Sequence, residues 1–365
     1  MKIVIVGGHM APALAVIEKL PKDISVVYIG RKETFEGDKG ESLEYQVIQK
    51  KGIPFINLPT GRLIRNLSIQ SMLSFAKVPF GLLTALSILK YTKPDVVLSF
   101  GGYLSVPVGV GAKLLGIPLI IHEQTLEAGA ANKFLASYAK KVCVSYISSE
   151  KFFPKNKTIL TGNPLMESNP SEKMKEMLGK DGKFSLVCIV GGSGGSHAIN
   201  ILIEKILPEL LTHYRVLHQT GNAKEYGDYE RLASMRESLG ENTKERYYLI
   251  KFIQPEDVQY VFEKADVLVS RSGMNTVATL LTLQKPVIFI PLPIGQKNEQ
   301  QKNAEYFVKN YPNLSHILSQ DDSPELLLSE ISAMIRKGKN SQKTKPERGN
   351  DAAEKIISIV KESTQ

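Results

Sequence analysis

A histidine stands in the tight turn that ends the first apolar run of the chain. The sequence opens MKIVIVGGHMAPALAV, where Ile3–Val6 is typical of a buried parallel strand and His9 follows Gly7 and Gly8. A side chain at the carboxyl end of such a strand points into the crevice where open α/β sheets bind ligands. The pKa of histidine suits proton abstraction near neutral pH. We predict that His9 is a general base, with a helix-capping histidine as the structural alternative.

Two more polar turns follow buried strands in the same half. Paired glycines, Gly101 and Gly102, precede Tyr103 and offer either an N–H cradle for an anion or an ordinary strand-to-helix turn. The next strand ends in a polar cluster made of His122, Glu123, Gln124 and Thr125. This cluster resembles the start of a zinc-protease motif, but no second histidine lies four residues on, so we expect no metal there.

The second half contains the clearest anion-binding signal. Gly191-Gly-Ser-Gly-Gly-Ser196, which includes Ser193, Gly194 and Gly195, follows an apolar strand. It lacks the Lys-Ser/Thr of a Walker loop and the later acidic residue of a dinucleotide fingerprint. Free N–H groups and a helix dipole there can hold a diphosphate. Each charge-assisted hydrogen bond contributes about 1.5–3 kcal/mol.

Other polar residues follow later strands of this half. Arg271, Ser272, Gly273, Asn275 and Thr276 come directly after one strand, and they allow close approach and donation to a ligand. Gln300 and Gln301 lie in a glutamine-rich run that is either a solvated loop or a reader of sugar hydroxyls. The chain contains no Asp-x-Asp pair, so we expect N–H groups rather than a metal to hold any leaving diphosphate.

Short apolar runs alternate with helical patterns in both halves, which predicts an α/β fold with doubly wound parallel sheets. The polar run 167–183 separates the halves, and 336–350 is expected to be a loop. We expect domains at 1–163 and 164–345, then a C-terminal helix within 346–365. The candidate strands are Ile3–Val6, Ser25–Ile29, Val96–Phe100, Pro118–His122, Lys141–Val144, Ser185–Val190, Val216–Gln219, Tyr247–Phe252, Val267–Ser270 and Val287–Pro291.

The composition of the chain limits the classes of partner that we expect it to bind. The 365 residues carry a formal charge of +9, which favours anionic partners, while the absence of tryptophan and of arginine-rich or zinc patterns argues against nucleic acid. Cys143 and Cys188 fit a reducing, cytosolic compartment. An apolar stretch from Met72 to Leu86, preceded by Arg62 and Arg65, is either core or a surface that docks on an anionic membrane.

In this order, the motifs resemble the MurG family over nearly the whole chain. The motifs are GGHMAPALAV, TGRLIR, SFGGYLSVP, GIPLIIHEQ, TGNP, GGSGGS, HQTG, RSGMNT and QKNEQQKNA. The resemblance implies two Rossmann-like domains in the GT-B arrangement. It implies an inverting, metal-independent transfer, without a cofactor, of N-acetylglucosamine from UDP to lipid I, an undecaprenyl-diphosphate-linked acceptor, on the cytoplasmic face of the membrane.

The resemblance also assigns site residues. His9 is the implied base, Gly7, Gly8, Gly101 and Gly102 the implied acceptor diphosphate site, and Tyr103 with 122–125 the rest of the acceptor side. On the donor side, Ser193 and its neighbours are implied to hold the diphosphate and Ile253 to contact uracil. Gln300 and Gln301 are implied to read the sugar, and Asn163 of the TGNP turn belongs to the same set.

Four departures from the family pattern leave alternatives open. The first glycine loop is shorter, and Thr125, Met166 and Thr279 stand where the family has Asn, Arg and an acidic residue. The alternatives are a related transferase for another UDP-sugar or glycolipid, and a non-catalytic nucleotide-sugar binding protein. An epimerase on the same two-domain plan is a further one, although the glycine turns carry no clear set of acid and base carboxylates.

Overall fold

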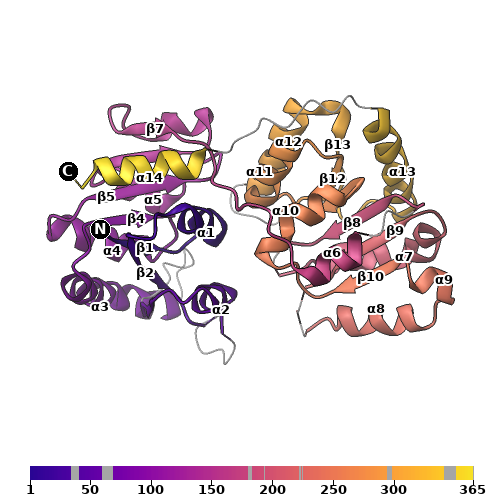
Figure 1. Cartoon of the computed structure of the whole chain (residues 1–365), viewed down its shortest axis with the longest axis horizontal. Helices are drawn as coiled ribbons and strands as arrows, with labels where there is room; N and C mark the ends of the chain where they lie inside the picture. Colours follow the sequence, from indigo (N-terminus) through magenta and orange to yellow (C-terminus); the bar gives the residue numbers. More distant parts are fainter. Residues whose placement is uncertain are drawn as a thin grey trace. The chain divides into compact units, whose positions relative to one another are not determined.

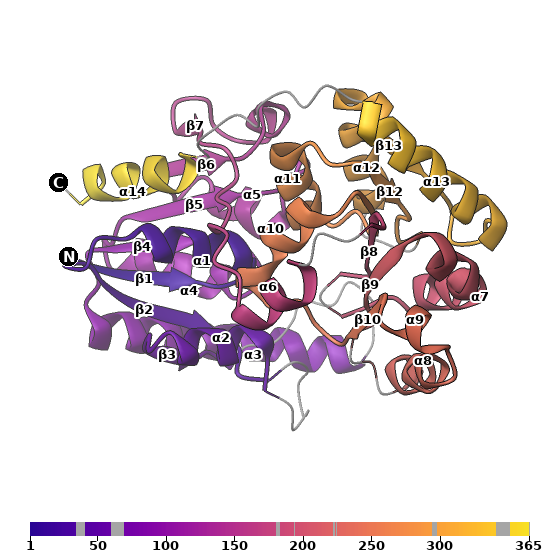
Figure 2. The same ribbon diagram turned by 45° about the vertical axis from the view of Figure 1, so that its right-hand side comes forward.

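The computed structural model describes residues 1–33, 41–59, 69–179, 183–192, 194–221, 223, 225–293, 298–340 and 351–364. The chain forms two compact units, Met1–Met166 with Gly349–Gln365, and Glu167–Arg348. Each unit has a parallel sheet covered by helices (Figures 1 and 2). The α/β, doubly wound prediction is therefore confirmed.

The first unit contains a seven-stranded sheet in the order β3-β2-β1-β4-β5-β6-β7. Its strands are β1 (Lys2–Val6), β2 (Ser25–Gly30), β3 (Phe55–Asn57), β4 (Val96–Ser99), β5 (Leu119–Glu123), β6 (Lys141–Val144) and β7 (Thr158–Leu160). Its helices are α1 (Met10–Lys19), α2 (Leu43–Lys50), α3 (Ile69–Thr92), α4 (Ser105–Leu114), α5 (Ala130–Leu135), the 3-10 turn η1 (Ile147–Phe152) and α14 (Ala352–Glu362). The buried face of α14, with Ile356 and Val360, joins the core around β1 and α1, so the last helix of the chain belongs to the first unit.

The second unit contains a six-stranded sheet in the order β10-β9-β8-β11-β12-β13. Its strands are β8 (Leu186–Val190), β9 (Arg215–Gln219), β10 (Tyr247–Ile250), β11 (Val267–Ser270), β12 (Val287–Phe289) and β13 (Ser315–Ile317). Its helices are α6 (Glu172–Leu178), α7 (His197–His213), α8 (Asp228–Glu237), α9 (Glu241–Lys244), α10 (Pro255–Lys264), α11 (Met274–Leu283), α12 (Glu299–Asn310), the 3-10 turn η3 (Pro312–Leu314) and α13 (Pro324–Asn340).

The structure corrects one local expectation and adds one helix. The segment expected to be a loop from residue 336 onward is helical up to Asn340, so α13 runs one polar turn beyond Ile335, its last buried apolar residue; 341–350 lie outside the described residues. The polar run 167–183 contains helix α6, whose first turn is capped by the Ser171 hydroxyl accepting from the Met174 N–H.

The apolar stretch proposed for a membrane is described only in part. The side chains of 60–79 lie outside the described residues, while Phe80 and Leu83 on α3 are 61% and 63% exposed. In the part of the chain that the structure describes, no helix is both long and apolar enough to cross a membrane.

Candidate active site

The predicted turns of the first unit meet at one edge of its sheet. From β1 the chain passes to β2 on one side, and β4 pairs with β1 on the other, so the carboxyl end of β1 is the topological switch point where open sheets bind ligands. Val6 lies opposite Ser99, and Ser99 lies opposite Ile121. The turns that begin after β1, β4 and β5 therefore lie side by side.

The two glycine turns of this unit are in backbone contact. A Cβ atom at Gly8 would lie 2.1 Å from the Gly101 carbonyl oxygen, and one at Gly102 would lie 2.9 Å from the Gly8 Cα. Gly101 and Gly102 also have φ values of +80° and +78°, which favour glycine. Close approach and positive φ thus explain the paired glycines at both strand ends.

Two buried serines fix the second turn. The Gly101 N–H donates to the Ser99 hydroxyl (3.2 Å), Ser99 donates to Ser105 (2.7 Å), and Ser105 donates back to the Gly101 carbonyl. Ser105 is the first residue of α4, and no side chain caps that helix. Its hydroxyl therefore closes a ring of hydrogen bonds that holds the glycine turn in place.

His9 occupies the N-cap position of α1, but its side chain makes no capping hydrogen bond. The capping alternative does not account for this imidazole. Burial lowers the pKa of His9 from its usual value, and the charge of Glu123 opposes that shift. The ring is therefore neutral at pH 7 and able to accept a proton, while a nearby carboxylate stabilises the imidazolium that results.

Glu123 organises the polar turn after β5. Its buried carboxylate accepts from the N–H groups of Thr125 and Gly129, both at 2.9 Å, from the Thr125 hydroxyl, and from the Asn132 side-chain amide at 2.9 Å. Four donors therefore surround this one carboxylate and hold the turn in place. The Thr125 hydroxyl is used inside this turn, also donating to the Glu127 carbonyl.

His122 and Asn163 both adjoin Ser145 in the first unit. The His122 Nε2 atom lies 3.2 Å from the Ser145 hydroxyl, which donates to the Asn163 Oδ1 at 3.4 Å. The structure thus brings Asn163, assigned to the donor side from the sequence, next to the acceptor-side residues of this unit. Among the described residues, no cluster of three or more His, Cys, Asp or Glu side chains could hold a metal ion.

The second unit repeats the design. Its switch point lies between β8 and β11, where the Gly191–Ser196 turn begins. A Cβ at Gly195, whose φ is +79°, would lie 2.1 Å from the Thr220 carbonyl oxygen. The Ser196 hydroxyl caps α7 by accepting from the Ile199 N–H. Ser193 lies outside the described residues.

Arg271 forms hydrogen bonds to several turns of the second unit. Its Nε donates to the Ser196 hydroxyl (3.1 Å), its Nη1 to the carbonyls of Ile290 and Pro291 (both 2.9 Å), and its Nη2 to the Gln320 side chain (3.0 Å). It is 7% exposed. We therefore interpret Arg271 as a positioning residue for the glycine turn.

Most of the remaining donor-side residues lie around α11 and α12. Gly273 is the N-cap of α11, and Asn275 and Thr276 occupy its first turn. Ser272 donates to the Gln300 carbonyl at 2.8 Å, while the Gln300 side chain accepts from the Leu292 N–H. The other positions are Gln301, which donates to Glu305, and Ile253, which is half-buried just after β10.

Several polar groups that support these turns carry no signal in the sequence. The Tyr28 hydroxyl donates to Glu44 at 2.6 Å, directly against Gly7, and burial raises the pKa of Glu44. In the second unit, Asn200 donates to the Thr220 carbonyl at 3.0 Å and to Asp228 at 2.7 Å, and its Oδ1 lies 3.0 Å from His218. These contacts join residues far apart in sequence, so no local pattern reveals them.

Because two histidines are buried, we predict that the protein loses stability in acid. Burial lowers the pKa of His122 to about 4 and that of His218 to about 3, from 6.5. In the unfolded chain both histidines take up a proton at a higher pH than in the folded chain. The free energy of unfolding should therefore fall as the pH drops from 6.5 toward 4, by several kcal/mol in total. Urea unfolding followed by circular dichroism between pH 7.5 and 4.5 measures this, and His218→Gln should give a shallower slope. An unchanged slope would contradict the assignment to His218.

Comparison with known proteins agrees with this geometry. Residues 6–144 match the glycosyltransferase family 28 N-terminal domain, and residues 186–360 match its C-terminal domain. The chain belongs to glycosyltransferase family 28. The MurG resemblance is confirmed with it, since relatives named as UDP-N-acetylglucosamine--N-acetylmuramyl-(pentapeptide) pyrophosphoryl-undecaprenol N-acetylglucosamine transferase cover nearly the whole chain.

Two of these family 28 relatives come from Lachnoclostridium phytofermentans (32% identical, covering 99% of this chain and 98% of the relative) and Halalkalibacterium halodurans (33% identical, 99% of both). Acinetobacter baumannii MurG has a similar structure, with 26% identity, a TM-score of 0.65 and coverage of 99% and 100%. A UDP-GlcNAc 2-epimerase from Neisseria meningitidis aligns with a TM-score of 0.66 at 14% identity, covering 99% and 100%, which shows a shared fold alone.

Proposed function

We propose that this family 28 enzyme transfers N-acetylglucosamine from UDP-N-acetylglucosamine to an undecaprenyl-diphosphate-linked sugar, the step from lipid I to lipid II in peptidoglycan synthesis. The names of its full-length relatives support this substrate pair. The observation that carries the proposal is the presence of a tight glycine turn at the switch point of each sheet, with His9 beside one of them.

In the proposed mechanism, His9 removes the proton from the acceptor hydroxyl as that oxygen attacks the anomeric carbon from the face opposite the leaving group. The bond from the anomeric carbon to the diphosphate breaks, and UDP carries away the electron pair. The Gly195 N–H donates to the Gly192 carbonyl within the turn, so the Gly194 N–H and the N-terminal dipole of α7 stabilise the leaving diphosphate, and no metal or cofactor takes part. The turns at Gly8 and Gly101 hold the acceptor diphosphate.

The proposed place of action is the cytoplasmic face of an anionic membrane, because the acceptor is a lipid. Exposed Phe80 and Leu83 on α3 and the net charge of +9 support contact with such a surface. Nucleic acid is not a proposed partner.

UDP release from UDP-N-acetylglucosamine tests this proposal, measured with and without a lipid I analogue in EDTA. We expect release that depends on the acceptor and is unchanged by EDTA. Loss of activity in EDTA would contradict the metal-free mechanism. UDP binding without release under any of these conditions would favour a binding protein.

A second candidate is the same chemistry with another UDP-sugar or glycolipid. Three departures from the family pattern are occupied by internal contacts: the Thr125 hydroxyl bonds within its own turn, Thr279 donates to the Asn275 carbonyl, and Met166 packs against the apolar core of the first unit. None of these side chains offers the amide or charge found in the family. Turnover only with a different donor in a sugar-nucleotide screen would favour this candidate.

A further inference from the structure

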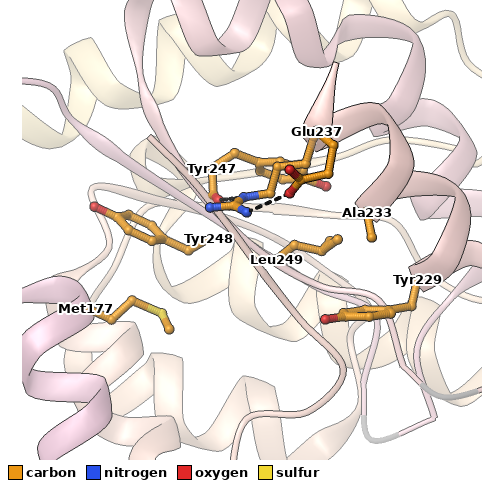
Figure 3. A pocket seen from close by; sticks show the side chains of 8 residues that line it. Met177, Tyr229, Ala233, Glu237, Tyr247, Tyr248 and Leu249 are labelled. Carbon is orange, nitrogen blue, oxygen red and sulfur yellow. Dashed lines mark hydrogen bonds and ion pairs between the residues drawn. The ribbon is translucent and has the colours of Figure 1, made fainter. Parts of the chain in front are cut away.

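A cavity of about 290 Å³ lies at the free edge of the second sheet (Figure 3). Its walls come from α6, α8 and the edge strand β10, and it lies away from the glycine turn after β8. Met177 projects into it from α6 and Tyr229 from α8, on opposite sides, with Leu249 of β10 between them. All three side chains are half-buried. The opening is therefore lined by a thioether, a ring and an aliphatic group.

The strand edge in this cavity has one free donor and acceptor pair. The carbonyls of Arg246 and Ile250 accept from β9. Because backbone groups of successive residues in a strand face opposite sides, the N–H and C=O groups of Tyr247 and Leu249 face the outer edge. The Tyr247 carbonyl accepts from the Arg236 Nε at 3.0 Å. Because β10 is the last strand of its sheet, the Leu249 N–H and C=O have no strand partner among the residues that the structure describes.

Two cations, Arg236 and Lys251, lie at or beside the walls of the cavity. Arg236 contacts Glu237 at 3.4 Å, and Lys244 also pairs with Glu237. Lys251 lies 4.5 Å from the centre of the Tyr229 ring and pairs with Glu230. Arg236 therefore lines the cavity and Lys251 lies beside its Tyr229 wall, each paired with an exposed carboxylate. Exposed pairs of this kind are weak, so an anionic ligand can replace a carboxylate at little cost.

We propose that this cavity binds a small planar heterocycle that carries an anionic group, of the purine nucleotide class. The ring lies between Tyr229 and Met177, its edge pairs with the Leu249 N–H and C=O, and its anionic group faces Arg236 and Lys251. A peptide strand does not fit, because Arg236 already occupies the neighbouring carbonyl and leaves only one pair free. This site is independent of the proposed glycosyl transfer.

Isothermal titration of the full chain with AMP, in saturating UDP to fill the donor site, tests the proposal. We expect AMP to bind, and Ala233→Phe, which fills the cavity, to weaken AMP binding at least tenfold while UDP binding stays unchanged. Ser234→Phe on the exposed face of the same helix is the matched control and should bind AMP normally. Tyr229→Leu is a second variant should Ala233→Phe fail to fold, and it should also weaken AMP binding.

Three outcomes overturn this assignment. They are the absence of AMP binding, AMP binding that survives both cavity variants, and binding of ribose 5-phosphate as tight as that of AMP, which would show that no base is recognised. Since the readout is binding with UDP present, each of these outcomes is separable from a failure of the proposed transfer reaction.

Discussion

His9→Ala is expected to lower turnover by about 100-fold or more while leaving UDP affinity unchanged. A positioned general base contributes about 10²–10⁴-fold, and His9 is the side chain at the first switch point with a lowered pKa and no capping role. The proposed donor turn lies in the other unit, so UDP binding should not change. Acceptor-dependent UDP release and UDP titration measure the two effects separately.

The control for this variant is His213→Ala, since His213 is exposed at the end of α7, and it should retain full turnover. The pH profile gives a second check. Because burial lowers the pKa of His9, the acid limb of the kcat/KM profile should lie below pH 6.5. Wild-type turnover in His9→Ala would exclude His9 as the base.

Most of the fold follows from the apolar periodicity of the sequence. Long buried runs such as Ile3–Val6 and Val267–Ser270 are strands as predicted, because parallel strands covered on both faces are apolar throughout. The strands β3, β7 and β13 are not among the predicted strands. Each has three residues and lies at or near a sheet edge, so partial exposure leaves too short an apolar run to recognise.

The glycine turns of the candidate site could be predicted from the sequence, but the side chains that support these turns could not. Gly8 and Gly195 are visible in the sequence because close backbone contact admits only glycine there, and Gly101 because its φ of +80° favours glycine. The serine ring around Gly101 and the Tyr28–Glu44 pair under Gly7 depend on which strands become neighbours. Arg271 shows the same limit, since its sequence context suggested a ligand while its donors bind carbonyls and side chains of its own unit.

The shortened first turn gives these supports added importance. With only Gly7 and Gly8 before His9, the first turn has few N–H groups, and the Glu44 carboxylate occupies the space where a Cβ at Gly7 would lie. The second turn is held rigidly by Ser99 and Ser105. In the proposed mechanism, the rigid Gly101–Gly102 turn therefore supplies the Gly102 N–H to an acceptor diphosphate in the first unit, while the Gly101 N–H stays bonded to Ser99.

Gly195→Ala is expected to weaken UDP binding at least tenfold, which corresponds to about 1.4 kcal/mol. The new Cβ would lie 2.1 Å from the Thr220 carbonyl oxygen, and the φ of +79° is unfavourable for alanine. Relief of that clash moves the turn away from β9 and displaces Ser196, the N-cap of α7, with it. The backbone N–H groups then no longer converge on a diphosphate. Titration with UDP measures the change.

The matched control for this variant is Gly240→Ala, in the same unit. Gly240 has a φ of −64°, and a Cβ there would meet no atom within 4 Å, so the same substitution should leave both the free energy of unfolding and UDP affinity unchanged. Circular dichroism separates a local displacement from unfolding of the unit. If Gly195→Ala folds and binds UDP as the wild type does, the diphosphate is held elsewhere, and the N–H groups of this turn are not the donor site.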